Sequence, residues 1–358
     1  MPKRELKKST KQLAKEVAKV SKEPVEKESS YIDVDNLIPS GSNLLNLACS
    51  DSHRGAYGLG KIVNSIGDSS TGKTYFALST LAEAAMIKRF NDYRLIFDDA
   101  ESANEFNIQK LFGKKLKKRL ETDIVSDTIE DYYGNLLKAI KDGRPFIYIL
   151  DSLDSVTSIA EQKRAEDYAK GKEPDGSYKT EKPRMVSELL RVVAGDIKQK
   201  EALVIIISQT RDNIGFGAQF QPKVRTGGKA LKFYSCHEMW HAVKSREQKK
   251  GIEIGAVIET RLTKNKLTGK RRIVETPIYP TSYGIDSITG NVNYLLANDY
   301  WKKNKQTIVA LDFKLEGTIK RLVGQIEDKG MEEDLDLLVA DVWHDIEDSL
   351  LLDRKPKY

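Results

Sequence analysis

A glycine-bounded loop that ends in a lysine and a threonine is the first segment of this chain that suggests a reactive site. It has the spacing G-x-x-x-x-G-K-T, and its members are Gly67, Asp68, Ser69, Ser70, Thr71, Gly72, Lys73 and Thr74. Glycines let the backbone wrap an anion, so that N–H groups and a helix start face it. Lys73 would reach the terminal phosphates of a nucleotide, and the Thr74 hydroxyl would coordinate Mg²⁺. The alternative is a glycine-rich turn that binds no ligand.

Acidic side chains near two other predicted strands could hold the metal and activate water. Asp151 ends a continuous apolar run. We expect it to hold Mg²⁺ through water, and the alternative is that it caps the following helix. Asp98, Asp99 and Glu101 follow a second apolar run. In a doubly wound sheet they would lie at the nucleotide edge, where one could deprotonate the attacking water or simply cap a helix. Glu101 is the first candidate for this base, although composition alone does not rank the three.

The elements that must carry these groups alternate between apolar strands and helices. The predicted strands are Lys61–Ile66, Arg94–Phe97, Pro145–Leu150 and Ala202–Ile207, and the predicted helices are Thr74–Arg89, Thr128–Lys141 and Met185–Lys198. Because strands this apolar are buried on both faces, they indicate an α/β fold with a mostly parallel central sheet. A strand before the loop and a helix after it favour nucleotide binding over a turn without a ligand. Adjacent strands within Glu253–Val274 predict an antiparallel extension.

The hydrophobic pattern divides the chain into three predicted parts. Residues 1–30 comprise a short amphipathic helix, Glu5–Ser21, and a polar linker. Residues 31–290 form the α/β core with the reactive loop. Residues 291–358 form a small, mostly helical and acidic region, with helix expected from Thr318 to Leu352.

Composition and charge restrict the classes of protein to which the chain can belong. No apolar run among the 358 residues approaches the ~20 residues of a membrane span. Two cysteines and four histidines without ligand spacing argue against a disulfide framework and a structural zinc site. Basic residues gather in Lys163–Arg184, Arg211–Lys232 and Lys264–Arg272, whereas Glu327–Asp353 is acidic. Such runs are usually solvated surface, but several basic loops in one chain favour a polyanionic partner.

Motifs in a set order between Val34 and Gly290 resemble the RecA-type homologous recombinases, namely bacterial RecA and phage UvsX-like proteins. The motifs are Ile38-Pro39-Ser40-Gly41-Ser42, Asp99-Ala100-Glu101, Leu150-Asp151-Ser152, Ser208-Gln209 and the closing stretch Thr226–Tyr234. The resemblance implies a RecA-like P-loop ATPase core with ATP and Mg²⁺ as cofactors. It also implies that Glu101 is the catalytic base, that Lys73 acts on the phosphates, and that Gln209 senses the γ-phosphate for a DNA-binding loop.

The same resemblance implies a surface for single-stranded DNA. The residues that it assigns to this surface are Arg184, Arg191, Arg211, Ile214, Gly215, Gly227 and Gly228. Most of them lie in a loop from Thr210 to Gly228, where basic side chains could neutralise phosphates and apolar ones could wedge between bases. Taken alone, such a loop is more often a mobile surface segment.

Lys264 and Lys266 resemble the lysine pair that reaches the γ-phosphate held by a neighbouring subunit. Alternation along a strand places both on one face, which by itself is typical of a solvated strand. ATP would then lie at a head-to-tail interface, and such contacts generate a helical filament, a homo-oligomer. Residues 1–30 would contact an adjacent subunit. The implied partners are single-stranded DNA, homologous duplex DNA, and single-strand-binding and mediator proteins, with no membrane, in the cytoplasm of a bacterium or of a phage's host.

Three features depart from the family. Tyr75, a nucleotide-binding residue by position, stands where the family has a small hydroxyl residue. Ile108 stands where the family has the tyrosine that stacks on adenine, and Phe106 could supply that stack instead. The stretch between Asp154 and Arg184 is longer and more basic than in bacterial relatives, so no individual DNA contact is assigned there.

These features predict an ATP-dependent recombinase, a DNA-dependent ATPase that forms filaments on single-stranded DNA and promotes homologous pairing and strand exchange in recombination and DNA repair. One alternative is a hexameric DNA helicase on the same core, although such enzymes usually carry an arginine finger and lack the closing stretch. Another is a non-catalytic, nucleotide-switched regulatory protein, which would lack DNA-stimulated ATPase activity.

Overall fold

One large sheet organises the chain from Val34 onward. The computed structural model describes residues 32–172, 181–212, 223–225 and 228–354, and the contacts of the chain divide it between Asp33 and Val34. The strands, in spatial order, are β12 (Gly284–Ile285), β11 (Ile273–Tyr279), β10 (Ile252–Asn265), β9 (His237–Lys249), β3 (Lys61–Gly67), β7 (Leu203–Asp212), β6 (Phe146–Asp151), β4 (Arg94–Asp99) and β5 (Leu120–Glu121). From β9 to β5 each strand is parallel to its neighbour, and from β9 to β12 each is antiparallel. The predicted α/β fold with a mostly parallel sheet and an antiparallel extension is confirmed.

The apolar strands are covered by helices on both faces. Along β6, Ile147 and Ile149 belong to one buried cluster, whereas Phe146, Tyr148 and Leu150 belong to another. Successive side chains of a strand point to opposite faces, so an uninterrupted apolar run requires cover on both sides. The first cluster includes side chains of α2 (Asn43–Ser50), α3 (Lys73–Met86) and α4 (Ile108–Arg119). The second includes side chains of α5 (Ile129–Asp142), α7 (Glu181–Gln199) and α8 (Gly228–Tyr234).

The predicted strands and helices are present, with shifted ends. The helix expected over Thr74–Arg89 is α3, which ends at Met86 because Ile87 adopts an extended backbone with φ −89° and ψ 125°. At the start of α5, the Thr128 hydroxyl accepts from the Asp131 N–H, and the Asp131 carboxylate accepts from the Thr128 N–H. These two bonds satisfy backbone N–H groups that have no acceptor within the helix. The elements that the periodicity did not predict include α2, α4, α6 (Ile159–Ala169), the pair β1 (Leu37–Ile38) and β2 (Tyr57–Gly58), and β8 (Lys223–Arg225), which pairs with β7.

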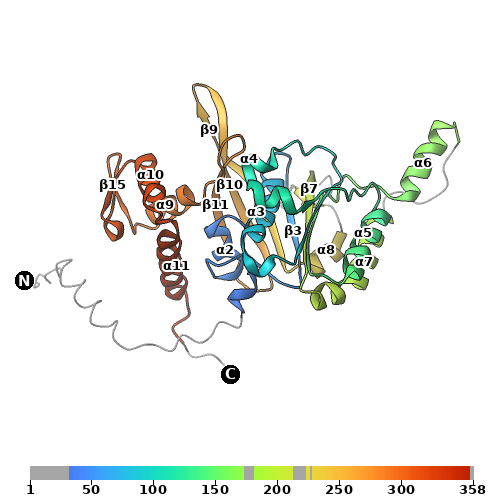
Figure 1. Cartoon of the computed structure of the whole chain (residues 1–358), viewed down its shortest axis with the longest axis horizontal. Coiled ribbons are helices and arrows are strands. Elements are labelled where there is room, and N and C mark those ends of the chain that lie inside the picture. Colours follow the sequence, from blue (N-terminus) through green and yellow to red (C-terminus); the bar gives the residue numbers. More distant parts are fainter. Residues whose placement is uncertain (1–31, 173–180, 213–222, 226–227, 355–358) are drawn as a thin grey trace, which may run out of the picture. The chain divides into compact units, whose positions relative to one another are not determined.

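The C-terminal part combines helices with a small sheet, drawn in orange to red in Figure 1. Its elements are α9 (Ser287–Ala297), β13 (Lys302–Asn304), β14 (Thr307–Ala310), β15 (Leu315–Gly317), α10 (Ile319–Lys329) and α11 (Glu332–Ser349). The helical tail expected from Thr318 is confirmed, but the three-stranded sheet was not expected because its strands are too short to produce a period. The boundary at residue 290 stays a prediction, and this residue lies within α9.

Three further observations concern the N-terminus, membrane-spanning helices and the cysteines. The predicted helix Glu5–Ser21 lies outside the described residues. Within the described residues, no helix is both long enough and apolar enough to cross a membrane. Cys49 and Cys236 are both buried and free.

Candidate functional site

The glycine-bounded loop joins β3 to α3 at the carboxyl end of the parallel strands. Gly72 has φ +79°, and a Cβ at this position would lie 2.8 Å from the Cδ1 atom of Ile278. The left-handed conformation favours glycine here. Ser70 also has a left-handed φ of 61°, which is uncommon for a residue with a side chain and typical of strained functional loops. The loop is therefore shaped as a cradle whose N–H groups can face an anion.

Lys73 and Thr74 begin α3 and point into the site. The Nζ atom of Lys73 donates to the carbonyl oxygen of Asp68 at 2.6 Å. Burial lowers the pKa of Lys73, while the nearby carboxylates of Asp151 and Glu101 act in the opposite direction. A buried ammonium with a backbone carbonyl as its close partner is suited to an anionic ligand such as a phosphate.

Thr74 and Asp151, the two predicted magnesium residues, are brought together by the sheet. The Thr74 hydroxyl donates to Oδ2 of Asp151 at 2.6 Å. Burial raises the pKa of Asp151 to about 6, and the neighbouring carboxylates of Glu101 and Asp99 add to this effect. A hydroxyl and a buried carboxylate with excess negative charge around it form the oxygen donor set that Mg²⁺ prefers. The residues present therefore fit the metal.

The three carboxylates after β4 have different environments. Asp98 is fully buried and accepts hydrogen bonds from the backbone and hydroxyl of Ser126 and from the Tyr148 hydroxyl, at 2.6–2.8 Å. Asp99 accepts from the Asn104 N–H at 3.0 Å. Asp98 is therefore a structural residue, and the base candidates that remain are Asp99 and Glu101, which both line the pocket described below.

Glu101 is linked to two neighbouring strands. Its Oε1 atom accepts from the Ser152 hydroxyl at 2.7 Å and from Nε2 of Gln209 at 2.9 Å. The backbone N–H of Gln209 donates to Oδ2 of Asp154 at 2.7 Å. Gln209 lies in β7, which continues to Asp212, so a single hydrogen bond connects the carboxylate to the strand that leads into the Thr210–Gly228 loop.

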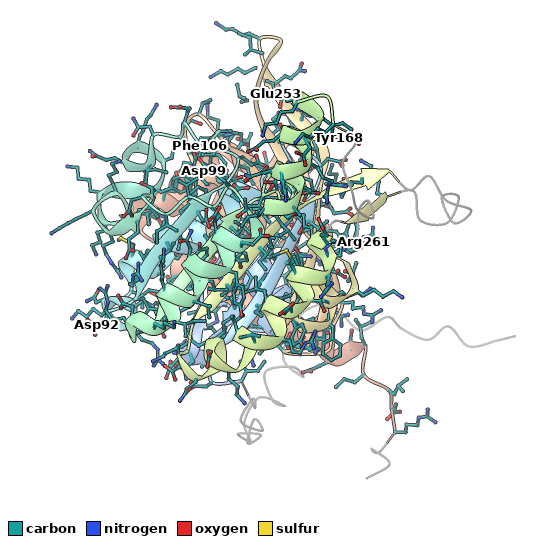
Figure 2. All side chains as sticks on the ribbon, turned by 90° about the vertical axis from the view of Figure 1, so that its right-hand side faces the viewer. Asp92, Asp99, Phe106, Tyr168, Glu253 and Arg261 are labelled. Carbon is teal, nitrogen blue, oxygen red and sulfur yellow. The ribbon has the colours of Figure 1, made fainter. Side chains whose placement is uncertain are left out.

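A pocket of about 560 Å³ extends from the loop toward the antiparallel part of the sheet. Its lining includes the predicted residues Ser69, Ser70, Thr71, Gly72, Lys73, Thr74, Tyr75, Glu101, Asp151 and Gln209. Figure 2 shows Asp99 and Phe106 on the same side of the molecule, with Asp92, which precedes β4, at the opposite side. The pocket thus lies at the carboxyl edge of the sheet, as expected for an open α/β fold.

Aromatic side chains line the pocket away from the phosphate cradle. The rings of Tyr75 and Phe106 meet edge to face, with centroids 4.9 Å apart, and the Tyr75 hydroxyl donates to the carbonyl oxygen of Pro280. Phe106 lines the pocket, whereas Ile108 packs against the apolar core. This arrangement makes Phe106, which lies beside Tyr75 in the pocket wall, available to a planar base.

Asp68 has a partner that the sequence did not suggest. Its carboxylate accepts from the Thr210 hydroxyl and forms an ion pair with Lys223 of β8, and the hydrogen bond from Lys223 is the main reason that the pKa of Asp68 is lowered. Thr210 and Lys223 both lie within the predicted DNA loop, in β7 and β8 respectively. The phosphate cradle and this loop are therefore in direct contact.

Lys264 and Lys266 converge at a different place. Both Nζ atoms donate to the carbonyl oxygen of Phe233 at the end of α8, at 2.9 and 3.2 Å respectively, and Lys264 also reaches the carbonyl of Lys232. Burial, together with the charge of Lys266, lowers the pKa of Lys264 to about 8. Neither lysine lines the pocket of its own chain. If this pair contacts a phosphate, that phosphate would therefore have to belong to a nucleotide bound by another subunit.

The residues assigned to DNA are only partly described. Arg184 and Arg191 are exposed on α7, Arg211 is exposed on β7 beside Asp154 at 3.4 Å, and Gly228 begins α8. Ile214, Gly215 and Gly227 lie outside the described residues. The long stretch after Asp154 contains α6, an element that the sequence did not predict.

A glycine cradle between a parallel strand and a helix, with a threonine and a strand-end aspartate in contact beside it, defines a P-loop nucleotide-binding protein of the α/β class. Comparison with known proteins narrows this class. The family described as the RecA N-terminal domain matches residues 4–286. The chain belongs to the RecA family.

Several proteins named Protein RecA are similar to this chain. The protein from Thermotoga petrophila is 30% identical over 248 residues, which are 68% of this chain and 63% of the relative. The protein from Xanthomonas axonopodis pv. citri is 31% identical over 254 residues, 69% of this chain and 67% of the relative. The protein from Francisella tularensis subsp. novicida is 32% identical over 238 residues, 66% of this chain and 60% of the relative. The chain thus spans less than two thirds of the Thermotoga and Francisella proteins.

Proposed function

We propose that the chain is an ATP-dependent recombinase that forms filaments on single-stranded DNA and promotes homologous pairing and strand exchange. The observation that carries this proposal is the 2.9 Å hydrogen bond between Gln209 and Glu101. It joins a carboxylate of the nucleotide pocket to the strand that enters the predicted DNA loop. Binding of a nucleotide in the pocket would therefore change the conformation of the loop. A DNA-dependent ATPase needs this coupling.

Each residue of the pocket has a task in this proposal. Lys73 and the loop N–H groups would bind the terminal phosphates, and Glu101 would orient and deprotonate the attacking water. Thr74 and Asp151 would hold Mg²⁺, which when bound would neutralise charge on the phosphate oxygens. Gln209 would exchange its hydrogen bond with Glu101 for one with the γ-phosphate. Release of that bond would shift β7 and the loop together.

The position of the lysine pair supports the proposed assembly. Lys264 and Lys266 lie at the end of α8, away from the pocket of their own chain. In a head-to-tail assembly they would contact the triphosphate of the next subunit. When successive head-to-tail contacts do not close into a ring, they generate a helical filament. ATP would therefore hold subunits together before it is hydrolysed, and hydrolysis would release the filament from DNA.

Electron microscopy with single-stranded DNA and a slowly hydrolysed ATP analogue tests this proposal. Helical filaments that disassemble when the analogue is replaced by ADP are the expected result. Closed rings would identify a helicase of the same core, and the absence of any assembly, together with an ATPase rate that DNA does not stimulate, would identify a nucleotide switch. A strand-exchange assay with homologous and non-homologous duplexes then measures the recombinase activity itself.

A further inference from the structure

The hairpin formed by β9 and β10 extends well beyond the strand beside it. The two strands have 13 and 14 residues, whereas β11 has only 7. Figure 1 shows the hairpin rising above the rest of the sheet. Its pairing register shifts between Glu253 and Gly255, so that Ile254 is an extra residue in β10. Such a bulge bends a strand and is frequent beside active sites.

Two contacts hold the bent hairpin against the end of β11. A Cβ at Gly255 would lie 2.5 Å from the Cδ1 atom of Tyr279, so only glycine allows this approach. The Tyr279 hydroxyl donates to Oε2 of Glu247 at 2.6 Å. The hairpin is thereby fixed next to Pro280, the residue whose carbonyl binds Tyr75.

As a result, Arg246 and Glu253 line the nucleotide pocket. The Nη1 atom of Arg246 lies 2.6 Å from Oε1 of Glu253, and the two side chains are 52% and 45% exposed. Ion pairs at this exposure contribute little to stability, so folding alone gives little reason for the pair. Figure 2 shows Glu253 on the same side of the molecule as Phe106 and Asp99.

We propose that Arg246, aligned by Glu253, binds the nucleoside part of the nucleotide. This inference rests on the proposed nucleotide site and extends it to a residue that lies outside the recognised motifs. Lys73 and Asp151 mark the phosphate end of the pocket, whereas the hairpin adjoins the wall of Phe106 and Pro280. A planar guanidinium can stack on a base and donate to ribose or ring acceptors, while the Glu253 carboxylate fixes its orientation.

Direct binding of nucleotides to the full chain without DNA tests this role. We expect Arg246→Ala to weaken ATP and ADP by the same factor of about ten, which corresponds to about 1.4 kcal/mol, because a nucleoside contact is common to both. Lys244→Ala is the matched control. Lys244 lies on the same strand and pairs with Glu275 at similar exposure, but it does not line the pocket. We expect this control to bind both nucleotides like the wild type.

The outcomes separate the inference from the proposed function. Wild-type affinity in Arg246→Ala, or a loss confined to ATP, would overturn the nucleoside assignment, and the second result would indicate a contact with the γ-phosphate. Arg246→Lys, which keeps the charge but not the planar fork, should recover only part of the affinity. Lys73→Ala tests the site itself: if it binds like the wild type, the proposed nucleotide site is wrong, whatever Arg246 does. Equal circular dichroism spectra and melting temperatures exclude unfolding.

Discussion

At the scale of single residues, the structure distinguishes three carboxylates that lie within four positions of the sequence. Asp98 satisfies three hydrogen-bond donors in the core and cannot reach a substrate. Glu101 accepts from Ser152 and Gln209 at the pocket edge. These two bonds orient one carboxylate oxygen and leave the other for a water molecule. These hydrogen-bond partners therefore favour Glu101 as the proposed catalytic base, in agreement with the motif in which it occurs.

We predict that Glu101→Gln abolishes most ATP hydrolysis while DNA binding in the presence of ATP persists. The amide cannot accept the proton of the attacking water, and loss of a positioned base typically costs 10²–10⁴-fold in rate. Single-turnover hydrolysis and fluorescence anisotropy with labelled oligonucleotide measure the two properties. Glu105→Gln, a nearby exposed carboxylate outside the pocket lining, is the control. Loss of DNA binding together with hydrolysis would show that the two steps are not separable.

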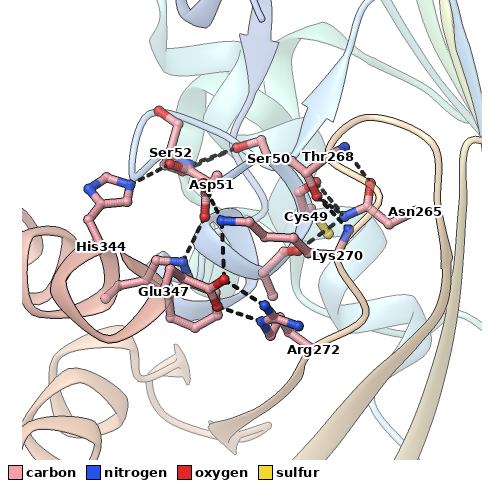
Figure 3. A network of polar contacts seen from close by, with 12 residues as sticks. Cys49, Ser50, Asp51, Ser52, Asn265, Thr268, Lys270, Arg272, His344 and Glu347 are labelled. Carbon is pink, nitrogen blue, oxygen red and sulfur yellow. Dashed lines mark hydrogen bonds and ion pairs between the residues drawn. The ribbon is translucent and has the colours of Figure 1, made fainter. Parts of the chain in front are cut away.

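At the scale of elements, a polar network ties α11 to the core (Figure 3). Glu347 forms two hydrogen bonds of 2.5 Å with Arg272 and an ion pair of 3.1 Å with Lys270. Lys270 and the indole of Trp343 both contact the carboxylate of Asp51, which follows α2. The acidic segment is thus partly a packed helix, α11, in which the Glu347 carboxylate is paired with Arg272 and Lys270.

We predict that Glu347→Gln lowers the free energy of unfolding by about 2 kcal/mol at pH 7, the usual range for hydrogen bonds to charged groups. Arg272 holds the pKa of the Glu347 carboxyl below its usual range. A lowered pKa in the folded state means stability that is present above the unfolded pKa of about 4.3 and lost as the pH falls through the folded pKa. The difference between wild type and variant should therefore shrink below about pH 4. Urea unfolding at several pH values measures it, and Asp348→Asn, exposed on the same helix, is the control for the loss of a carboxylate.

At the scale of the whole molecule, the proposed nucleotide pocket and the proposed intersubunit lysines lie at different places on one chain. The pocket lies at the carboxyl edge of the parallel strands, whereas Lys264 and Lys266 lie at the end of α8. The helix that carries their acceptor carbonyls begins at Gly228, where the predicted DNA loop ends. Withdrawal of the lysines toward a neighbour's triphosphate would remove hydrogen bonds from this helix, so assembly and DNA binding would affect one another.

We predict that the double variant Lys264→Ala and Lys266→Ala binds ATP like the wild type when monomeric but forms no filaments. The reason is that the pair contacts no part of its own pocket, whereas the proposed interface loses two cations. Sedimentation velocity and electron microscopy with single-stranded DNA measure the assembly. Lys302→Ala with Lys303→Ala, two exposed lysines of β13, is the control for lost charge. Filaments of normal length formed by the double variant Lys264→Ala and Lys266→Ala would disprove the intersubunit role of these lysines.

Much of the fold could be predicted from the sequence because its signals are local. The apolar runs of β3, β6 and β7 and the loop that ends in Lys73 depend on residues close together in the chain, and they indicated the parallel sheet and the reactive loop. Elements without an extended hydrophobic pattern in the sequence were not predicted, including α6 and the sheet β13–β15. The segment before Val34 remains a prediction.

The sequence by itself indicated which residue types could bind a triphosphate, and it predicted that Asp151 and Thr74 lie together as a candidate metal site. Only the tertiary structure decided that Gln209 meets Glu101 across 108 positions and that Arg246 reaches the pocket. The physical reason is that such contacts depend on strand register, on bulges and on which strands are neighbours. These depend on packing across the whole sheet, and no periodicity within a single strand encodes them.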